Sequence, residues 1–189
     1  RKYLREFLMD KRVIDIPFIS RWLLVNLIIA PFRAPKSAKI YRELWEDRGS
    51  PLLFHGMDLK DKLMKRLGDG FTVSFGMRYQ KPSIASALDE LLAANVKKII
   101  VLPLFPHYAS ASTGSVIEEV MDVIKGRLVF PELEFITNFP DNKLMLQTFT
   151  ENAKKHMRSM DFDHFIFSYH GLPERQILKS AVDNYCQIN

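Results

Sequence analysis

Apolar and polar residues follow two periods along this chain, one helical and one typical of extended strands. Apolar positions three and four apart recur in several segments, and from residue 71 onward short apolar runs separate them. The pattern predicts helices over residues 1–9, 36–47, 51–67, 82–94, 115–125 and 142–157, and strands over 71–79, 97–104, 133–138 and 164–169. Strands that alternate with helices predict βαβ units, an α/β fold and a mostly parallel sheet. Because these strands are apolar runs, we expect both faces of the sheet to be covered.

Residues 13–33 form the most hydrophobic stretch of the chain. Between Ile16 and Phe32 the only charged residue is Arg21, and Pro17 and Pro31 bracket the run. The stretch is too short and too interrupted to predict a membrane-spanning helix. Two interpretations stay open: a core helix, or an exposed apolar lip over 16–32 that meets a membrane or a hydrophobic ligand.

The composition is that of an ordinary soluble globular protein. The chain has 189 residues, 47% of them hydrophobic and 26% charged, which is enough for one core or for one domain and part of a second. A net charge of +5 suits an acidic ligand, a membrane surface or nucleic acid. The sequence has no RNA-binding signature and no paired Cys/His zinc spacing, so nucleic acid is disfavoured. A single cysteine, Cys186, excludes an internal disulfide and fits a reducing compartment; we interpret it as a buried thiol.

The ends of the sequence differ from those of a complete chain. Arg1 lies inside a helical pattern, Asn189 follows no closing element, and no signal peptide is recognisable. We therefore expect a fragment, or the ordered part of a longer chain. Neither a GxGxxG fingerprint nor a P-loop follows any predicted strand, so a nucleotide cofactor is disfavoured.

The strongest candidate for chemistry is His170, in the segment FIFSYHGLPER at 165–175. This histidine directly follows a predicted buried strand, and Gly171 and Pro173 indicate a sharp turn after it. An imidazole at this place can bind a divalent metal or accept protons near neutral pH. It can equally cap the next helix or bond to a backbone carbonyl, and the segment alone does not decide between these interpretations.

Two other predicted strands also end in polar or aromatic residues. Arg78 and Tyr79 end the first strand, and the second runs into a loop over 104–114. Ligands of parallel sheets bind beyond the carboxyl ends of the strands, so these two ends and the one at His170 should face one cleft. Arg78 could pair with a carboxylate ligand or simply lie on the surface.

The loop over 104–114 offers several groups with more than one interpretation. Its hydroxyls could cradle an anion at the start of the following helix, or cap that helix. The histidine and tyrosine before them could line a pocket or pack within the loop. These residues are His107, Tyr108, Ser110, Ser112, Thr113 and Gly114.

Five segments in order make the sequence resemble ferrochelatases. They read RKYLREFLMDKRVIDIP, SAKIYRELWEDRGSPLL, FGMRYQKPSIASALDEL, LPLFPHYASASTGS and FSYHGLPER, and they span nearly the whole chain. The resemblance implies insertion of Fe²⁺ into a porphyrin and two Rossmann-like lobes, each a parallel sheet flanked by helices, with the porphyrin between them. On this basis residues 1–138 are the N-terminal chelatase lobe without its first strand. Residues 139–189 are the truncated start of the C-terminal lobe.

The resemblance also implies roles for single residues. The family's metal-binding and proton-accepting histidine falls on His170, whose carboxylate partner belongs to the family's C-terminal half, outside this chain. Arg78 and Tyr79 match an Arg-Tyr pair that lines the porphyrin pocket. Across an alignment gap near Trp45–Arg48, three further residues fall near positions that contact the porphyrin and its propionates: Arg33, Tyr41 and Ser50. A flat apolar ligand with acidic edges needs apolar walls and a few cations, which agrees with this set.

Two departures from the family pattern bear on cofactors. Some members hold an iron–sulfur cluster with a ligand at the position of Ser110, so a cluster is disfavoured here. Some carry a histidine after a Trp-Pro pair, where this chain has Phe139-Pro140-Asp141-Asn142. We expect no cofactor beyond the substrate iron.

The resemblance favours an iron chelatase over two alternatives, a chelatase that loads another metal such as cobalt and a non-catalytic porphyrin-binding module. The expected partners are a porphyrin (protoporphyrin IX or coproporphyrin III), ferrous iron and a membrane surface at 16–32. The expected location is the cytoplasm, with or without membrane association. We expect the 189-residue chain alone to be inactive.

Overall fold

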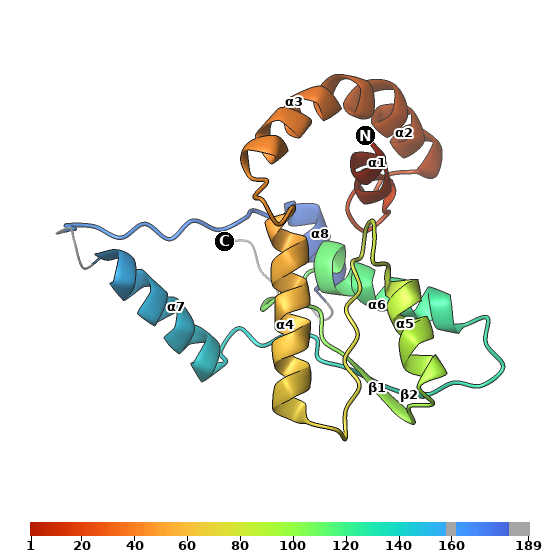
Figure 1. The fold of residues 1–189 in the computed structure, drawn as a ribbon. Helices are drawn as coiled ribbons and strands as arrows, with labels where there is room; N and C mark the ends of the chain where they lie inside the picture. Colours follow the sequence, from red (N-terminus) through yellow and green to blue (C-terminus); the bar gives the residue numbers. More distant parts are fainter. Residues whose placement is uncertain (158–161, 182–189) are drawn as a thin grey trace.

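The structure, a computed structural model, describes residues 1–157 and 162–181. Cys186, interpreted above as a buried thiol, lies outside the described residues. The elements are α1 (Lys2–Met9), α2 (Phe18–Leu23), the π-helical η1 (Leu24–Ile29), α3 (Ala30–Glu43), α4 (Pro51–Leu67), α5 (Ile84–Ala93), β1 (Lys98–Val101), the π-helical η2 (Ser110–Gly114), α6 (Ser115–Ile124), β2 (Glu132–Phe135), α7 (Lys143–Met157) and α8 (Glu174–Ser180) (Figure 1).

The core is a βαβ unit in which α5 and α6 pack against one face of a short parallel sheet. Within the described residues the sheet consists of β1 and β2, paired in register from Lys98–Glu132 to Val101–Phe135. The buried cluster is Ile84, Leu88, Ile99, Val120 and Ile124. The parallel βαβ prediction is therefore confirmed for this unit. The expectation that both sheet faces are covered is wrong here, because Ile100, which follows buried Ile99 along β1 and so faces the other side, is 49% exposed.

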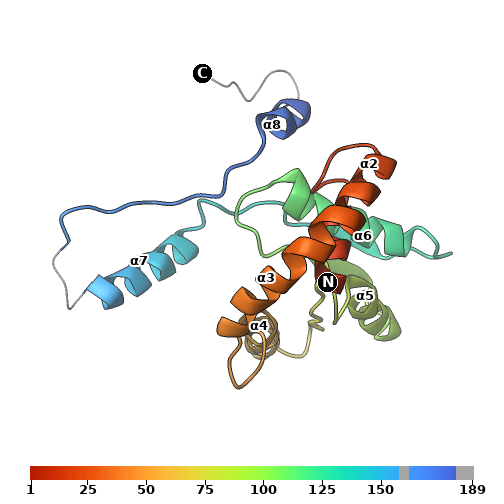
Figure 2. The same cartoon turned by 90° about the horizontal axis from the view of Figure 1, so that it is seen from above.

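Residues 18–43 form a continuous curved helical segment, which we call the apolar arm (Figures 1 and 2). Its curvature follows from the π-helical turn at η1 and from Pro31 and Pro35, which lack the amide hydrogen that a regular helix needs. The helix predicted over 36–47 thus starts earlier, at Ala30, and ends at Glu43.

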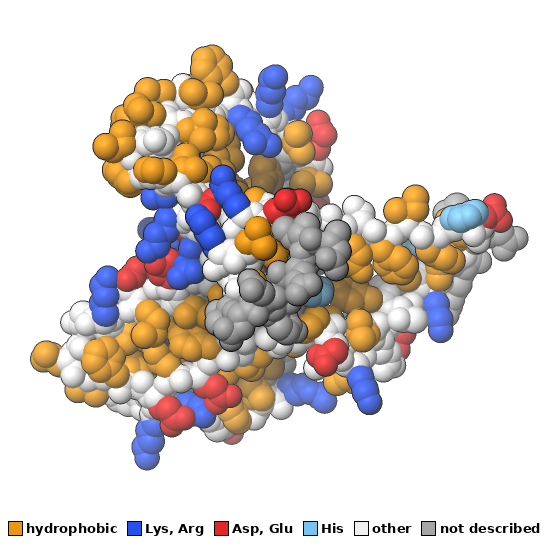
Figure 3. All heavy atoms as spheres, turned by 180° about the vertical axis from the view of Figure 1, so that it is seen from behind, with side chains coloured by type: hydrophobic (Ala, Val, Ile, Leu, Met, Phe, Trp, Pro, Cys, Tyr) orange, Lys and Arg blue, Asp and Glu red, His pale blue; other side chains and the backbone are white. Residues whose placement is uncertain are grey.

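Most large side chains of the apolar arm face solvent (Figure 3). Those with exposed fractions between 44% and 74% are Phe18, Ile19, Trp22, Leu23, Leu27, Ile28, Phe32, Ile40 and Tyr41. The core-helix interpretation holds only for Val25, Ala30 and Ala34, which are buried, and the exposed-lip interpretation agrees with the exposed side chains. No helix within residues 1–157 or 162–181 is long and apolar enough to cross a membrane.

The helices α4, α5, α6 and α7 lie where the sequence predicts them, within a few residues. Pro51 occupies the first turn of α4, and Ser83 caps α5 by accepting a hydrogen bond from the amide of Ser86 at 3.1 Å. Each helix therefore starts at a local signal that is readable in the sequence.

Residues 71–79 do not form the predicted strand. The segment crosses between α4 and α5 with one isolated bridge, from Met77 to Ser83. Close packing holds it in place, because a Cβ on Gly56 of α4 would lie against the ring of Phe75, and one on Gly76 would lie 2.9 Å from Cα of Ile84. A strand needs a hydrogen-bonded neighbour, and the described residues supply none here.

Residues 164–169 are neither a strand nor buried, contrary to prediction. Phe165, Ile166 and Phe167 are 63%, 92% and 80% exposed. Both views show α7 and the segment after it projecting away from the rest of the molecule (Figures 1 and 2). The apolar run has the composition of a strand but lacks a sheet to join within the described residues.

Candidate functional site

The carboxylate of Asp10, at the end of α1, joins three parts of the molecule. Its Oδ2 accepts hydrogen bonds from Arg78 Nη2 at 3.0 Å, from the Tyr79 hydroxyl at 2.9 Å and from the Ser115 hydroxyl. Its Oδ1 accepts from the amide of Arg12 at 2.7 Å. The Asp10 side chain is 3% exposed, so these contacts replace nearly all of its water.

The guanidinium of Arg78 is occupied by groups of the chain itself. Its Nε donates to the carbonyl oxygen and the hydroxyl of Ser115, at 3.0 and 2.7 Å, and its Nη1 lies 3.0 Å from Oε2 of Glu119. With Nη2 bonded to Asp10, every guanidinium nitrogen has a partner inside the protein. The predicted contact of Arg78 with a ligand carboxylate stays a prediction, and in this structure Arg78 joins α1 to α6.

This network changes the acidity of two groups. Burial is the largest influence on Asp10 and acts to raise its pKa. It is outweighed by hydrogen bonds from Ser115, Arg12 and Tyr79 and by the charge of Arg78, so that the pKa of Asp10 is lowered. Burial raises the pKa of Tyr79 to about 12, and the Asp10 carboxylate adds to this rise. Asp10 is thus held ionised and Tyr79 neutral.

An aromatic cluster connects Tyr79 with the apolar arm. The Tyr79 ring meets the rings of Phe7 and Tyr3 edge-on, with centroids 5.4 and 6.3 Å apart, and Tyr3 meets the ring of Tyr41 at 6.4 Å. The structure therefore brings together Tyr41 and Tyr79, two predicted substrate-binding residues 38 positions apart in the sequence, through Tyr3 of α1.

The hydroxyls of the loop before α6 bond within the chain. Ser110 accepts from Nη1 of Arg12 at 3.1 Å, and Ser112 donates to the Ala109 carbonyl at 3.3 Å. Thr113 is fully buried. No side chain caps α6, so the capping interpretation is wrong, and the bonds of Ser110 and Ser112 leave the anion-cradle interpretation without support.

The remaining predicted site residues lie apart from this network. Arg33 is exposed on α3, and His170 is exposed after the extended run that precedes α8. Ser50 starts α4 without a side-chain cap, its carbonyl accepting from the amides of Leu53 and Phe54 at 3.0 and 3.1 Å. Of the three chain segments expected to face one cleft, the structure brings together those at Arg78 and before Ser115, but not the one at His170.

The segment after His170 is nevertheless tied to the base of the apolar arm. Arg175 and Lys179 of α8 both pair with Asp15, the latter at 3.0 Å. Asp15 lies between Ile14 and Ile16, whose carbonyls accept from Nη1 of Arg21 at 3.0 and 3.1 Å. Within residues 1–157 and 162–181, no group of three or more His, Cys, Asp or Glu side chains could hold a metal ion.

A hollow near the start of the sheet is remote from these residues. This hollow measures about 710 Å³ and is lined by residues 95–97 and 127–131 together with Leu92, which precede β1 and β2. Ligands of parallel sheets bind at the opposite, carboxyl edge, so we do not assign the site to it. Another hollow, about 210 Å³, lies beside the Asp10 network and is lined by Met9, Asp10, Lys11, Arg21, Arg78, Glu118 and Asp122.

Comparison with known proteins decides the family. A family model for ferrochelatase matches residues 1–188. The chain belongs to the ferrochelatase family. It is 45% identical over 184 residues to the ferrochelatase of Legionella pneumophila (strain Corby). These 184 residues cover 97% of this chain and 54% of the Legionella protein. It is 43% identical over 188 residues to the ferrochelatase of Coxiella burnetii, covering 100% of this chain and 51% of that protein.

The chain spans about half the length of the ferrochelatases it matches. The α/β unit of α5, β1, α6 and β2 and the apolar arm thus belong to a ferrochelatase-family chain. Sequence reasoning missed Asp10, Tyr3 and Ser115 in this region. The only local signal at Asp10 is an acidic residue followed by Lys11 and Arg12, which is common on protein surfaces.

Proposed function

We propose that the protein inserts Fe²⁺ into a porphyrin, protoporphyrin IX or coproporphyrin III, and so makes haem with release of two protons. The observation that carries this proposal is the match to the ferrochelatase family over residues 1–188. The fold adds a second argument, since exposed apolar side chains of the arm and the rings of Tyr41 and Tyr79 are the kind of surface that a flat apolar ligand needs. We propose no cofactor beyond the substrate iron.

We assign metal binding and proton acceptance to His170. A neutral imidazole can accept a pyrrole proton and can ligate a divalent metal. Its exposure leaves the ring accessible. Arg33, Tyr41, Ser50, Arg78 and Tyr79 are proposed to form the wall and edge of the porphyrin site, on the resemblance set out above.

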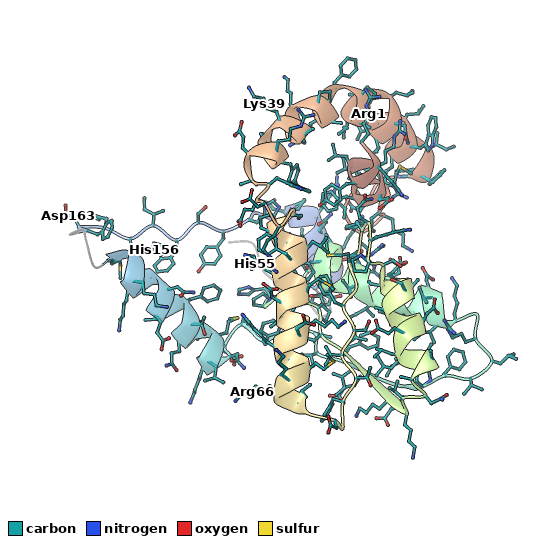
Figure 4. All side chains as sticks on the ribbon, in the orientation of Figure 1. Arg1, Lys39, His55, Arg66, His156 and Asp163 are labelled. Atoms are coloured by element: carbon teal, nitrogen blue, oxygen red, sulfur yellow. The ribbon has the colours of Figure 1, made fainter. Side chains whose placement is uncertain are left out.

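The test is anaerobic iron insertion by the full-length protein carrying His170→Ala. Figure 4 shows His55 on α4 and His156 at the outer end of α7. His156→Ala serves as the matched control, because the His156 ring is exposed on this projecting helix. We expect loss of insertion by at least about 100-fold in His170→Ala with unchanged circular dichroism. Near-normal activity of that variant contradicts the role of His170.

Two alternatives are separated by the choice of substrate. A chelatase for another metal would insert Co²⁺ into a precorrin-type tetrapyrrole faster than Fe²⁺ into a porphyrin. A binding module would hold porphyrin tightly without turnover. We expect neither behaviour from the full-length protein.

We propose that residues 1–138 form one Rossmann-like lobe and residues 139–189 begin a second, so that the chain alone lacks activity. Residues 71–76, which have no partner strand within the described residues, and the exposed apolar run at 164–169 fit sheets completed by other parts of a longer chain. Hydrogen exchange offers the test: both segments should gain protection in the full-length protein relative to residues 1–189. Equal exchange in the two proteins contradicts the division.

We further propose a cytoplasmic location with peripheral membrane contact through residues 16–32. Exposed Phe18, Ile19 and Phe32 suit an interfacial helix. In liposome sedimentation of the full-length protein, Ile19→Glu should weaken binding several-fold. Leu128→Glu, fully exposed before β2, should have no effect. Equal binding by both variants contradicts the contact.

A further inference from the structure

The four hydrogen-bond partners of Asp10 all act as donors to it. They are the amide of Arg12, Nη2 of Arg78, and the hydroxyls of Tyr79 and Ser115. A carboxylate satisfies them with two acceptor oxygens. An amide in its place would turn its own NH₂ group toward a donor in either orientation, so the position requires the charged acid.

The contacts of Asp10 determine the orientation of the Tyr79 ring. The hydroxyl end of the ring is held by the carboxylate, its edge meets Phe7 and Tyr3, and the Arg78 guanidinium lies 4.8 Å from its centroid. Tyr3 in turn meets Tyr41 near the end of the apolar arm. Asp10 therefore anchors a chain of contacts that reaches from α6 to the arm.

We propose that Asp10 is a positioning residue for the porphyrin site, because it fixes the Tyr79 ring and, through Tyr3, the part of the apolar arm that carries Tyr41. The inference rests on the proposed function. Asp10 is too buried to meet the substrate, and it acts through Tyr79. Arg78 belongs to the same hydrogen-bond network, since its bonds to Ser115 and Glu119 hold the backbone that precedes Tyr79.

The competing explanation is that Asp10 merely fastens α1 to the core. A neighbouring ion pair separates the two explanations. Glu118 of α6 pairs with Lys11 and Arg12, at 2.5 and 2.7 Å, and so fastens the same segment to the same helix. No hydrogen bond joins Glu118 to Tyr79 or Arg78 among the described residues. Glu118→Gln is therefore a matched control for fastening alone.

The experiment measures KM for porphyrin and kcat for Fe²⁺ insertion in the full-length protein, with porphyrin affinity from fluorescence. The variants are Asp10→Asn, Tyr79→Phe, the double variant, and Glu118→Gln. We expect Asp10→Asn to raise KM about tenfold while kcat changes less than about threefold, since hydrogen bonds to a charged group are lost. Glu118→Gln should stay within about twofold of wild type. The double variant should exceed the larger single effect by less than about twofold, because both changes break the same contact.

Equal KM effects of Asp10→Asn and Glu118→Gln, or multiplying effects of Asp10→Asn and Tyr79→Phe, overturn the proposal. If Asp10→Asn does not fold, Tyr79→Phe decides the matter, and an unchanged KM overturns it. A wild-type protein that neither binds porphyrin nor inserts iron contradicts the proposed function instead, a result that differs from all of these.

Discussion

Lys179 of α8 donates to the carboxylate of Asp15 at 3.0 Å, across 164 positions of the sequence. Arg175 pairs with the same carboxylate, so α8 is held by two cations at the base of the apolar arm. Side chains of both cations are more than half exposed, so the attachment depends on charges that water and salt screen.

Asp15→Asn should therefore loosen α8 without unfolding the protein. Trypsin cuts after Arg and Lys, and both partners of Asp15 are such residues. We expect cleavage at Arg175 and Lys179 of the full-length protein to become several-fold faster, with a smaller difference at high salt. Asp122→Asn, which removes an exposed pair with Lys125 on α6, is the control. Unchanged cleavage in Asp15→Asn would show that other contacts hold α8.

Acid should weaken the fold partly through Asp10. The pKa of Asp10 is lower in the folded protein than its ordinary value of 3.8, so its carboxylate stabilises the fold above that value. This stabilisation is lost as the pH falls through the lower, folded pKa. Urea unfolding between about pH 2 and 6 should show a shallower pH dependence in Asp10→Asn than in wild type. Parallel curves for the two proteins would contradict the prediction.

Alkali should weaken the fold partly through Tyr79. Its pKa is raised from 10.0 to about 12, so the neutral ring is favoured by the folded state. The associated stability is complete below pH 10 and is lost as the pH rises toward about 12. Absorbance titration near 295 nm should show a late tyrosine ionisation that Tyr79→Phe removes. A titration of unchanged shape in that variant would refute the assignment.

Gly76 should not tolerate a side chain. A Cβ there would lie 2.9 Å from Cα of Ile84 and 3.2 Å from Cβ of Ala87, and backbone cannot yield as a flexible side chain does. We expect Gly76→Ala to lower the free energy of unfolding by about 2 kcal/mol, as measured by urea denaturation. Gly70→Ala is the comparison, because nothing lies within 4 Å of a Cβ at that position. Similar stabilities of the two variants would contradict the packing described here.

Local signals were enough to predict most of the helices, whereas only two of the four predicted strands form within the described residues. Proline at position 51, the cap at Ser83 and the periodicity of 115–125 act within one turn of the helices they start or define. A strand depends on a neighbour elsewhere in the chain. The runs 71–79 and 164–169 have strand composition, yet within the described residues neither has a partner strand in a sheet.

The same distinction applies to the candidate site. Arg78 and Tyr79 stood out because they follow an apolar run, and their neighbourhood was anticipated from the strand-end rule. Asp10 could not be found this way, because its partners lie 68, 69 and 105 positions away. Its importance arises only when α1, the segment before α5 and the start of α6 come together.

Those separations have a consequence for synthesis. The apolar arm leaves the ribosome well before Ser115, and the hydrogen bond between Asp10 and Ser115 cannot form until residue 115 has emerged. At about 5–20 residues per second, the intervening 105 residues take roughly 5–20 s. Ribosome-bound chains that end before and after the emergence of α6 should accordingly differ in protease protection of the arm. During that interval the exposed apolar side chains of the arm can contact other apolar surfaces before the Asp10 network has formed.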